Sequence, residues 1–150
     1  MKNVLSAIDF SPITEKVIDY TKRIVAADNG KIRLLHVAEP PPEFLGEKFG
    51  PPVERELRAE VVKKHHKKLD ELAASLSEEG FDVKPIIVQG ATIETIIEQA
   101  EKGEADIIIL GSHGKGPLAK IVMGSTTEGV IRKSKIPVLV IPHSLEESKS

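Results

Sequence analysis

Residues 111–126, GSHGKGPLAKIVMGST, hold glycines in the spacing Gly-x2-Gly-x9-Gly and end in a Ser-Thr pair. Glycine lets backbone N–H groups approach an anion closely. A helix that begins after Gly124 would direct its free N–H donors and its partial positive charge at the same place. The hydroxyl groups of Ser125 and Thr126 would add two more donors. The segment therefore predicts a binding site for a polyphosphate.

Two better-known nucleotide motifs do not fit this segment. A P-loop needs Lys-Ser/Thr after its second glycine, whereas Gly116 is followed by Pro117. The dinucleotide fingerprint fits only loosely, because its glycines follow the fourth predicted strand instead of the first. A purely structural interpretation stays open: residues 125–128, STTE, match a capping box, and Gly111 and Gly114 could form only the turn that leaves a strand.

Other combinations of reactive side chains give weaker signals. Asp9, His113 and a serine do not make a convincing hydrolase triad, because the chain has no Gly-x-Ser-x-Gly elbow. His65 and His66 are adjacent, so on a helix they point about 100° apart and cannot share a metal. We expect both on a solvated helix face and no metal site. His36 lies within a predicted strand and is expected to be buried or half-buried.

The elements that must position the glycine segment follow from the apolar periodicity. Short apolar runs predict five strands at 4–8, 32–38, 83–89, 105–110 and 138–141. Between them, the pattern predicts four helices. The first begins at Ser11-Pro12 and the second ends at Gly80. The third ends near Gly103, and the fourth begins at about Thr126. Strands that alternate with helices imply right-handed crossovers and a doubly wound parallel sheet. We expect one domain over residues 1–150.

In a sheet of this kind, ligands bind beyond the carboxyl ends of the strands, where the strand order reverses. Asp9, Val37, Gly90 and Gly111 all lie at such ends. Residues 39–52 contain five of the ten prolines, so they are expected to form a loop, and no role is assigned to them. The location of a site is thus predicted independently of the glycine motif.

Composition narrows the classes of partner. The 21 basic and 23 acidic side chains leave a net charge of −2, and aromatic residues make up only 3%. Nucleic-acid and membrane-surface binders usually carry a basic excess, so neither partner is expected. The absence of Cys excludes disulfides and thiolate chemistry. The first residues do not resemble a signal peptide, and no apolar run approaches a membrane span, so we expect a cytoplasmic protein.

The chain resembles the universal stress protein family over essentially its whole length. The resemblance rests on four segments that occur in the family's order: VLSAIDFSPITEKVIDYT, IRLLHVAEP, VQGATIETIIEQAEKGEADIIILGSHGKG and GSTTEGVIRKSKIPVLVIP. The complete Gly-x2-Gly-x9-Gly-[Ser/Thr] motif marks the ATP-binding branch of that family. The resemblance implies a five-stranded parallel sheet with helices on both faces, a Rossmann-like fold of the adenine-nucleotide alpha hydrolase-like type.

The resemblance also implies roles for individual residues. Asp9 would accept a hydrogen bond from a ribose hydroxyl, beside the backbone of Ala7 and Ile8, and the backbone of Val37 would meet the adenine edge. The family often has proline where this chain has Ala7, a difference that concerns local stiffness more than chemistry. The ribose–phosphate turn would be lined by Gly111, His113 and Gly114. The phosphates would be held by Gly124, Ser125 and Thr126.

The function implied is an ATP-binding stress-response module that acts as a nucleotide-dependent switch toward an unknown protein partner. Its ligand would be ATP or another adenine nucleotide, with or without Mg²⁺, and it would form a homodimer through the last strand, 138–141. Two alternatives stay open: a weak ATPase or phosphotransferase, and an interaction module that binds no nucleotide. No residue is placed as a general base or as a Walker-B-type carboxylate, so efficient hydrolysis is not expected.

Overall fold

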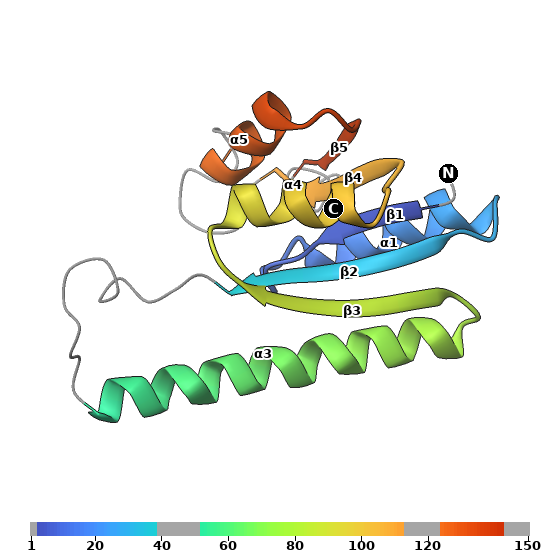
Figure 1. The fold of residues 1–150 in the computed structure, drawn as a ribbon. Coiled ribbons are helices and arrows are strands. Elements are labelled where there is room, and N and C mark those ends of the chain that lie inside the picture. Colours follow the sequence, from blue (N-terminus) through green and yellow to red (C-terminus); the bar gives the residue numbers. More distant parts are fainter. Residues whose placement is uncertain (1–2, 39–51, 113–123, 143–150) are drawn as a thin grey trace, which may run out of the picture.

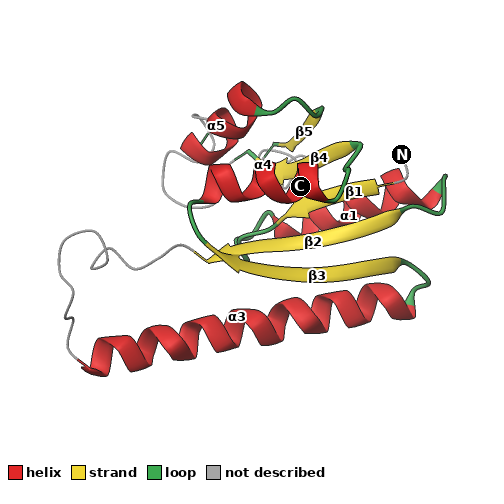
Figure 2. Cartoon of the chain, in the orientation of Figure 1, coloured by secondary structure: helices red, strands yellow, loops and turns green. Residues whose placement is uncertain are grey.

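A computed structural model of the chain describes residues 3–38, 52–112 and 124–142. Strands and helices alternate along these residues (Figures 1 and 2). In chain order the elements are β1 (Asn3–Ala7), α1 (Thr14–Ala26), β2 (Lys31–Ala38), α3 (Pro52–Glu78), β3 (Asp82–Gln89), α4 (Thr92–Lys102), β4 (Ile107–Gly111), α5 (Ser125–Lys133) and β5 (Val138–Ile141). His113, Gly114 and most of the proline-rich segment 39–52 lie outside the described residues.

The five strands form one parallel sheet in the order β3-β2-β1-β4-β5. The chain moves outward from β1 to β3 on one side, then returns to pair β4 with β1 on the other side. The order therefore reverses between β1 and β4, which is where open α/β sheets bind ligands. The predicted fold class, a doubly wound five-stranded parallel sheet, is confirmed.

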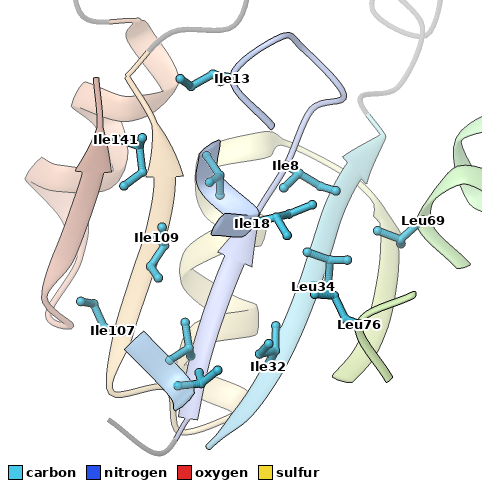
Figure 3. Close-up of a cluster of buried hydrophobic side chains, with 13 residues drawn as sticks. Ile8, Ile13, Ile18, Ile32, Leu34, Leu69, Leu76, Ile107, Ile109 and Ile141 are labelled. Atoms are coloured by element: carbon cyan, nitrogen blue, oxygen red, sulfur yellow. The ribbon is translucent and has the colours of Figure 1, made fainter. Parts of the chain in front are cut away.

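Helices cover both faces of this sheet. One buried cluster joins the sheet to α1 and α3, and ten of its residues are labelled in Figure 3. A second cluster joins the opposite face to α4 and α5. The interior strand β4 contributes to both, since Ile107 and Ile109 belong to the first cluster and Ile108 and Leu110 to the second. Burial on both faces explains why this strand is an unbroken apolar run.

The serine within the apolar run of β1 has a buried polar partner. Ser6 is fully buried, and its hydroxyl lies 2.6 Å from the Thr21 hydroxyl of α1. Thr21 in turn donates to the carbonyl of Val17 at 2.7 Å, so the proton of the shared bond comes from Ser6. A buried hydroxyl is tolerated when it is hydrogen-bonded, and this pair holds α1 in register with β1.

Helix α3 is the long helix that the sequence predicts, with 27 residues. At 1.5 Å per residue it is about 40 Å long, whereas the eight residues of β3 span about 26 Å. Its carboxyl-terminal half is anchored by buried Leu69 and Leu76, and its other end extends past the strands (Figure 1). Val61, in the amino-terminal half of the helix, is 49% exposed.

The start of α1 differs from the prediction. Helix α1 begins at Thr14 and not at Ser11-Pro12, and its N-cap position is Ile13, which makes no side-chain cap hydrogen bond. The Ser11 N–H instead donates to a carboxylate oxygen of Asp9 at 2.9 Å, and the Ser11 carbonyl accepts from Thr14 at 3.0 Å. This tight turn uses the backbone of Ser11 and leaves its hydroxyl, among the described residues, without a hydrogen-bond partner.

None of the helices in the described ranges combines the length and the apolar character that crossing a bilayer requires.

Candidate functional site

The residues that leave β1 and β4 emerge side by side at one edge of the sheet. Ser6 pairs with Ile109 in the β1–β4 register. Asp9 and Ser112 each follow three residues later along parallel strands, so both lie at the carboxyl edge. This edge is also the point where the strand order reverses. The structure thus brings the predicted site residues of β1 and β4 to the location expected for a ligand.

The two ends of the glycine segment are in direct contact. The Gly124 N–H donates to the Ser112 carbonyl at 2.9 Å, and the Ser112 N–H donates to the Ile141 carbonyl of β5 at 2.9 Å. These bonds attach the start of α5 to the ends of β4 and β5. The strand-end glycine and the helix-start glycine, which are thirteen residues apart in sequence, therefore belong to one structural unit.

The capping box, which the sequence leaves open as an alternative at Ser125, does not form. Gly124 occupies the N-cap position, with φ −66° and ψ 155°, and its carbonyl accepts the first helical bond from Glu128 at 3.0 Å. Ser125 is already the first helical residue, it is exposed, and no side-chain cap bond forms. Because the first N–H groups of a helix have no carbonyl partner within it, the amides of Ser125 and Thr126 remain suited to an anion.

Thr127, which the sequence indicates only as a member of the capping box, fixes this arrangement. Its hydroxyl is buried and donates to the carbonyl of Gly111 at 2.8 Å, with the Ser112 carbonyl also within 3.2 Å. These carbonyls belong to the end of β4. The sequence signal that could have identified Thr127 is its place in the first turn of the helix, together with the rule that a buried hydroxyl needs a hydrogen-bond partner.

The glycines at the two ends do not adopt an unusual backbone conformation. A Cβ on Gly111 would lie 2.7 Å from Cγ2 of Ile13, and Figure 3 shows Ile13 beside the end of β4. Close packing against Ile13, at the start of α1, therefore requires glycine at position 111. Gly124 has an ordinary extended conformation at the N-cap position, with no positive φ.

Asp9 lies exposed in the turn that leaves β1. One of its carboxylate oxygens accepts the Ser11 N–H at 2.9 Å, which orients the carboxylate. Within the described part of the chain, the second oxygen has no hydrogen bond and is available as an acceptor. The predicted role of Asp9 as an acceptor for a hydroxyl group is compatible with this geometry.

Val37 offers its backbone toward the same edge. The last residue pair of the β1–β2 ladder is Ala7 with Leu35, and the Leu35 carbonyl accepts the Ile8 N–H at 2.9 Å. Peptide groups two residues apart along a strand point the same way. The N–H and C=O of Val37 therefore point toward the β1 side, just beyond the last described pair of that ladder. A donor and an acceptor from one residue stand together there.

A ring cluster beside Asp9 was not predicted. Phe10 lies 4.8 Å from His36 and 5.0 Å from His65 between ring centroids, and the two histidine rings are 4.8 Å apart. His36 is buried, as expected. His65 was expected on a solvated face, which is wrong, because the β1–α1 turn places Phe10 against it. His66 is exposed, as expected, and lies 3.3 Å from Asp70.

The described residues contain no group of three or more His, Asp or Glu side chains that could hold a metal. A groove of about 360 Å³ lies elsewhere, between α1 and α3. Ile18, Leu72 and Leu76 contribute apolar side chains to it, and the rest is lined by charged residues of α1, by Ser75 of α3 and by Glu79, which follows α3. Its residues come from helix surfaces and not from the ends of strands, so it is separate from the edge described above.

Comparison with known proteins places this geometry in a family. The model of the universal stress protein family matches residues 1–142. The universal stress protein MJ0577 of Methanocaldococcus jannaschii is 36% identical over 152 residues, which cover 93% of this chain and 94% of that protein. A solved structure of MJ0577 superimposes with a TM-score of 0.82 at 37% identity, covering 95% of this chain and 96% of the other.

Two further solved structures share the fold at lower identity. A universal stress protein in complex with cAMP gives a TM-score of 0.65 at 22% identity, covering 94% of this chain and 96% of that one. A universal stress protein family protein from Arabidopsis thaliana with AMP bound gives a TM-score of 0.70 at 19% identity, covering 98% of this chain and 95% of that one. Because the family model covers nearly the whole chain and MJ0577 matches it over almost its full length, the chain belongs to the universal stress protein family.

Proposed function

We propose that this protein binds an adenine nucleotide at the sheet edge between β1 and β4 and acts as a nucleotide-dependent regulatory module in the stress response. The observation that carries the proposal is the hydrogen bond from Gly124 to Ser112. It holds the start of α5 at the edge where Asp9 also emerges. A phosphate-binding helix end and a hydroxyl-binding carboxylate thus share one edge.

The start of α5 supplies the phosphate end of the site. The amides of Ser125 and Thr126 carry the partial positive charge of the helix terminus, and phosphate groups bind readily at such ends. Ser125 is exposed and makes no cap bond, so its hydroxyl can donate to a phosphate oxygen. Thr127 keeps this end rigid through the Gly111 carbonyl. We assign Gly124, Ser125 and Thr126 to the phosphates.

The ends of β1 and β2 supply the adenosine end. Adenine carries an amino donor near a ring-nitrogen acceptor, and the C=O and N–H of Val37 complement that pair. The Asp9 carboxylate, oriented by Ser11, is assigned to a ribose hydroxyl. The backbone at Ala7, Ile8 and Gly111 would line the space between the base and the phosphates.

Two of the compared structures support the adenine nucleotide as the class of ligand, since those proteins were solved with cAMP and with AMP. Their likeness to this chain is one of fold, so the proposal for this chain rests on its own residues. The complete glycine motif, with three free amides expected at the start of α5, favours a nucleotide with several phosphates. We therefore propose ATP, with or without Mg²⁺, as the ligand to test first.

Thermal unfolding with nucleotides tests the proposal. A ligand at 100 times its dissociation constant stabilises a protein by about 2.7 kcal/mol, which for a chain of this size raises Tm by roughly 5–10 °C. We expect ATP or ADP to raise Tm and GTP to raise it less, because Val37 is complementary to adenine. A flat Tm across ATP, ADP and AMP at millimolar concentration would contradict nucleotide binding.

We also propose a homodimer through β5. The strand order leaves β5 at an edge of the sheet, paired on one side with β4. Val138, Leu139 and Val140 are only half-buried there, and an apolar edge strand invites pairing with a second copy. Light scattering at micromolar concentration should give twice the mass of the chain, and a monomeric mass would remove this part of the proposal.

A further inference from the structure

The residue before Asp9 is held by β2 in an unusual way. The N–H of Ile8 donates to the Leu35 carbonyl at 2.9 Å, as in a regular parallel ladder. In such a ladder the next bond would run from the Val37 N–H to the Ile8 carbonyl. Instead, the Ile8 carbonyl lies 2.9 Å from Nδ1 of the His36 side chain, and the described ladder ends at the pair of Ala7 and Leu35.

The direction of this hydrogen bond is fixed by its chemistry. A carbonyl oxygen only accepts, so Nδ1 of His36 must carry a hydrogen and donate it. The ring is 6% exposed and lies on the α1–α3 face of the sheet, beside Phe10 and His65. The buried imidazole therefore replaces a backbone amide as the partner of Ile8.

The same cluster holds the residue after Asp9. Phe10 has a φ of 60°, a left-handed conformation that costs a residue with a side chain roughly 1–2 kcal/mol. Its ring packs against His36 of β2 and His65 of α3, and the Lys68 ammonium lies 5.9 Å from its centroid. Asp9 is thus fixed from both sides, by the hydrogen bonds of Ile8 and by the rings around Phe10.

We propose that His36 is a positioning residue for nucleotide binding: by taking the Ile8 carbonyl, it ends the β1–β2 ladder and leaves the amide of Val37 open for the adenine base. This inference rests on the proposed function. His36 itself does not touch the nucleotide; it acts through Ile8 and Val37. His65 extends the same cluster to α3 through its ring contacts with Phe10 and His36.

Two substitutions separate this role from simple packing. His36→Asn keeps an N–H donor close to the position of Nδ1 but removes the ring, whereas His36→Phe keeps a ring and removes the donor. The same two substitutions at the exposed His66, His66→Asn and His66→Phe, provide the matched control. If His36 only fills space, the phenylalanine variant will bind ATP better than the asparagine variant.

The first measurement is the ATP dissociation constant by titration calorimetry. Loss of one net hydrogen bond corresponds to about a tenfold weakening, so we expect His36→Phe to bind ATP about tenfold more weakly. His36→Asn should stay within about threefold of the parent, and both His66 variants should match it. Equal or tighter binding by His36→Phe than by His36→Asn would overturn the inference.

A second measurement needs no nucleotide. Amide hydrogen exchange by NMR should show the Val37 N–H exchanging rapidly in the parent protein and becoming protected in His36→Phe, where it can bond to the Ile8 carbonyl. The Leu35 N–H, inside the ladder, should be protected in both. A protected Val37 amide in the parent, or an Nε2–H tautomer of His36 in its ¹⁵N spectrum, would refute the inference even if ATP binds. Failure of ATP to bind would refute the proposed function separately.

Discussion

Ser125 is the residue at which the two interpretations of the glycine segment separate. A capping serine would use its hydroxyl on the helix, whereas a phosphate-binding serine must keep it free. Sequence cannot decide between them, because both place a serine near a helix start. The structure excludes the cap by one position: Gly124 takes the N-cap, so Ser125 lies inside the helix with its side chain exposed.

Replacing Ser125 by alanine should therefore weaken nucleotide binding and leave stability nearly unchanged. Removing one donor to a phosphate should weaken ATP binding roughly 5–20-fold. Because Ser125 makes no cap bond, the free energy of unfolding should change by less than about 0.5 kcal/mol. Ser77→Ala, at an exposed serine on α3, is the control for both measurements. A loss of about 1 kcal/mol or more in urea unfolding of Ser125→Ala would instead indicate a cap.

At the scale of elements, the contact between the end of β4 and the start of α5 forms the phosphate end of the proposed site. Thr127 makes this contact through two carbonyls of the strand end. The sequence predicted both elements but not their attachment, since a side-chain hydrogen bond across sixteen positions leaves no periodic signal. For the same reason it did not predict the packing of Phe10 against His65.

Thr127→Val tests this attachment, because valine has nearly the same shape without the hydroxyl. The change should destabilise the protein by about 1–2 kcal/mol, since a buried hydrogen bond to the strand-end carbonyls is lost. It should also weaken ATP binding by loosening the start of α5. Thr126→Val, one position earlier and without a described hydrogen bond, is the stability control. Equal stabilities of the two variants in denaturant unfolding would contradict the assigned role.

The contact between α4 and α5 carries a small dependence on pH. Glu94 has its pKa lowered below the ordinary value by a backbone hydrogen bond and by Lys133, whose ammonium lies 3.1 Å away. A lowered pKa in the folded state means that the stabilisation is present above the unfolded pKa of about 4.5 and is lost as pH falls through the folded pKa. Both side chains are exposed, so the effect should be small.

The free energy of unfolding of Glu94→Gln should accordingly fall less than that of the parent as pH drops below about 4.5. The two proteins should therefore differ less in stability at low pH than at pH 7. Glu98→Gln, whose carboxylate lies on the same helix, is the control and should keep the parent's slope. Unfolding midpoints in urea between pH 3 and pH 7 measure both. A Glu94→Gln curve parallel to that of the parent would show that the pair has no role.

At the scale of the whole molecule, much of the fold was predictable and its strand order was not. Apolar periodicity located all five strands, because buried β-branched runs such as 107–110 have few alternatives. Boundaries moved by one or two residues; β4 begins at Ile107, which is also where its pairing with Val4 of β1 begins. The order β3-β2-β1-β4-β5 depends on pairings between distant segments, which periodicity does not encode.

The candidate site was likewise predictable only in part. Its location was predictable, because parallel strands with crossover helices place Asp9, Val37 and Gly111 at one edge. The identity of the supporting residues was not, since Thr127 and His36 act through contacts that exist only in three dimensions. The separate groove between α1 and α3 likewise has no counterpart in the sequence, and it is a competing place for a ligand to bind.

The most direct test of nucleotide binding at the β1–β4 edge is the map of amide chemical-shift changes when ATP is added to ¹⁵N-labelled protein. We expect the largest changes at Asp9, Val37, Ser112, Ser125 and Thr126, with AMP reproducing those at Asp9 and Val37 but only weakly those of α5. Changes confined to the α1–α3 groove, at Ile18, Leu72 and their neighbours, or no changes at saturating ATP, would contradict binding at this edge.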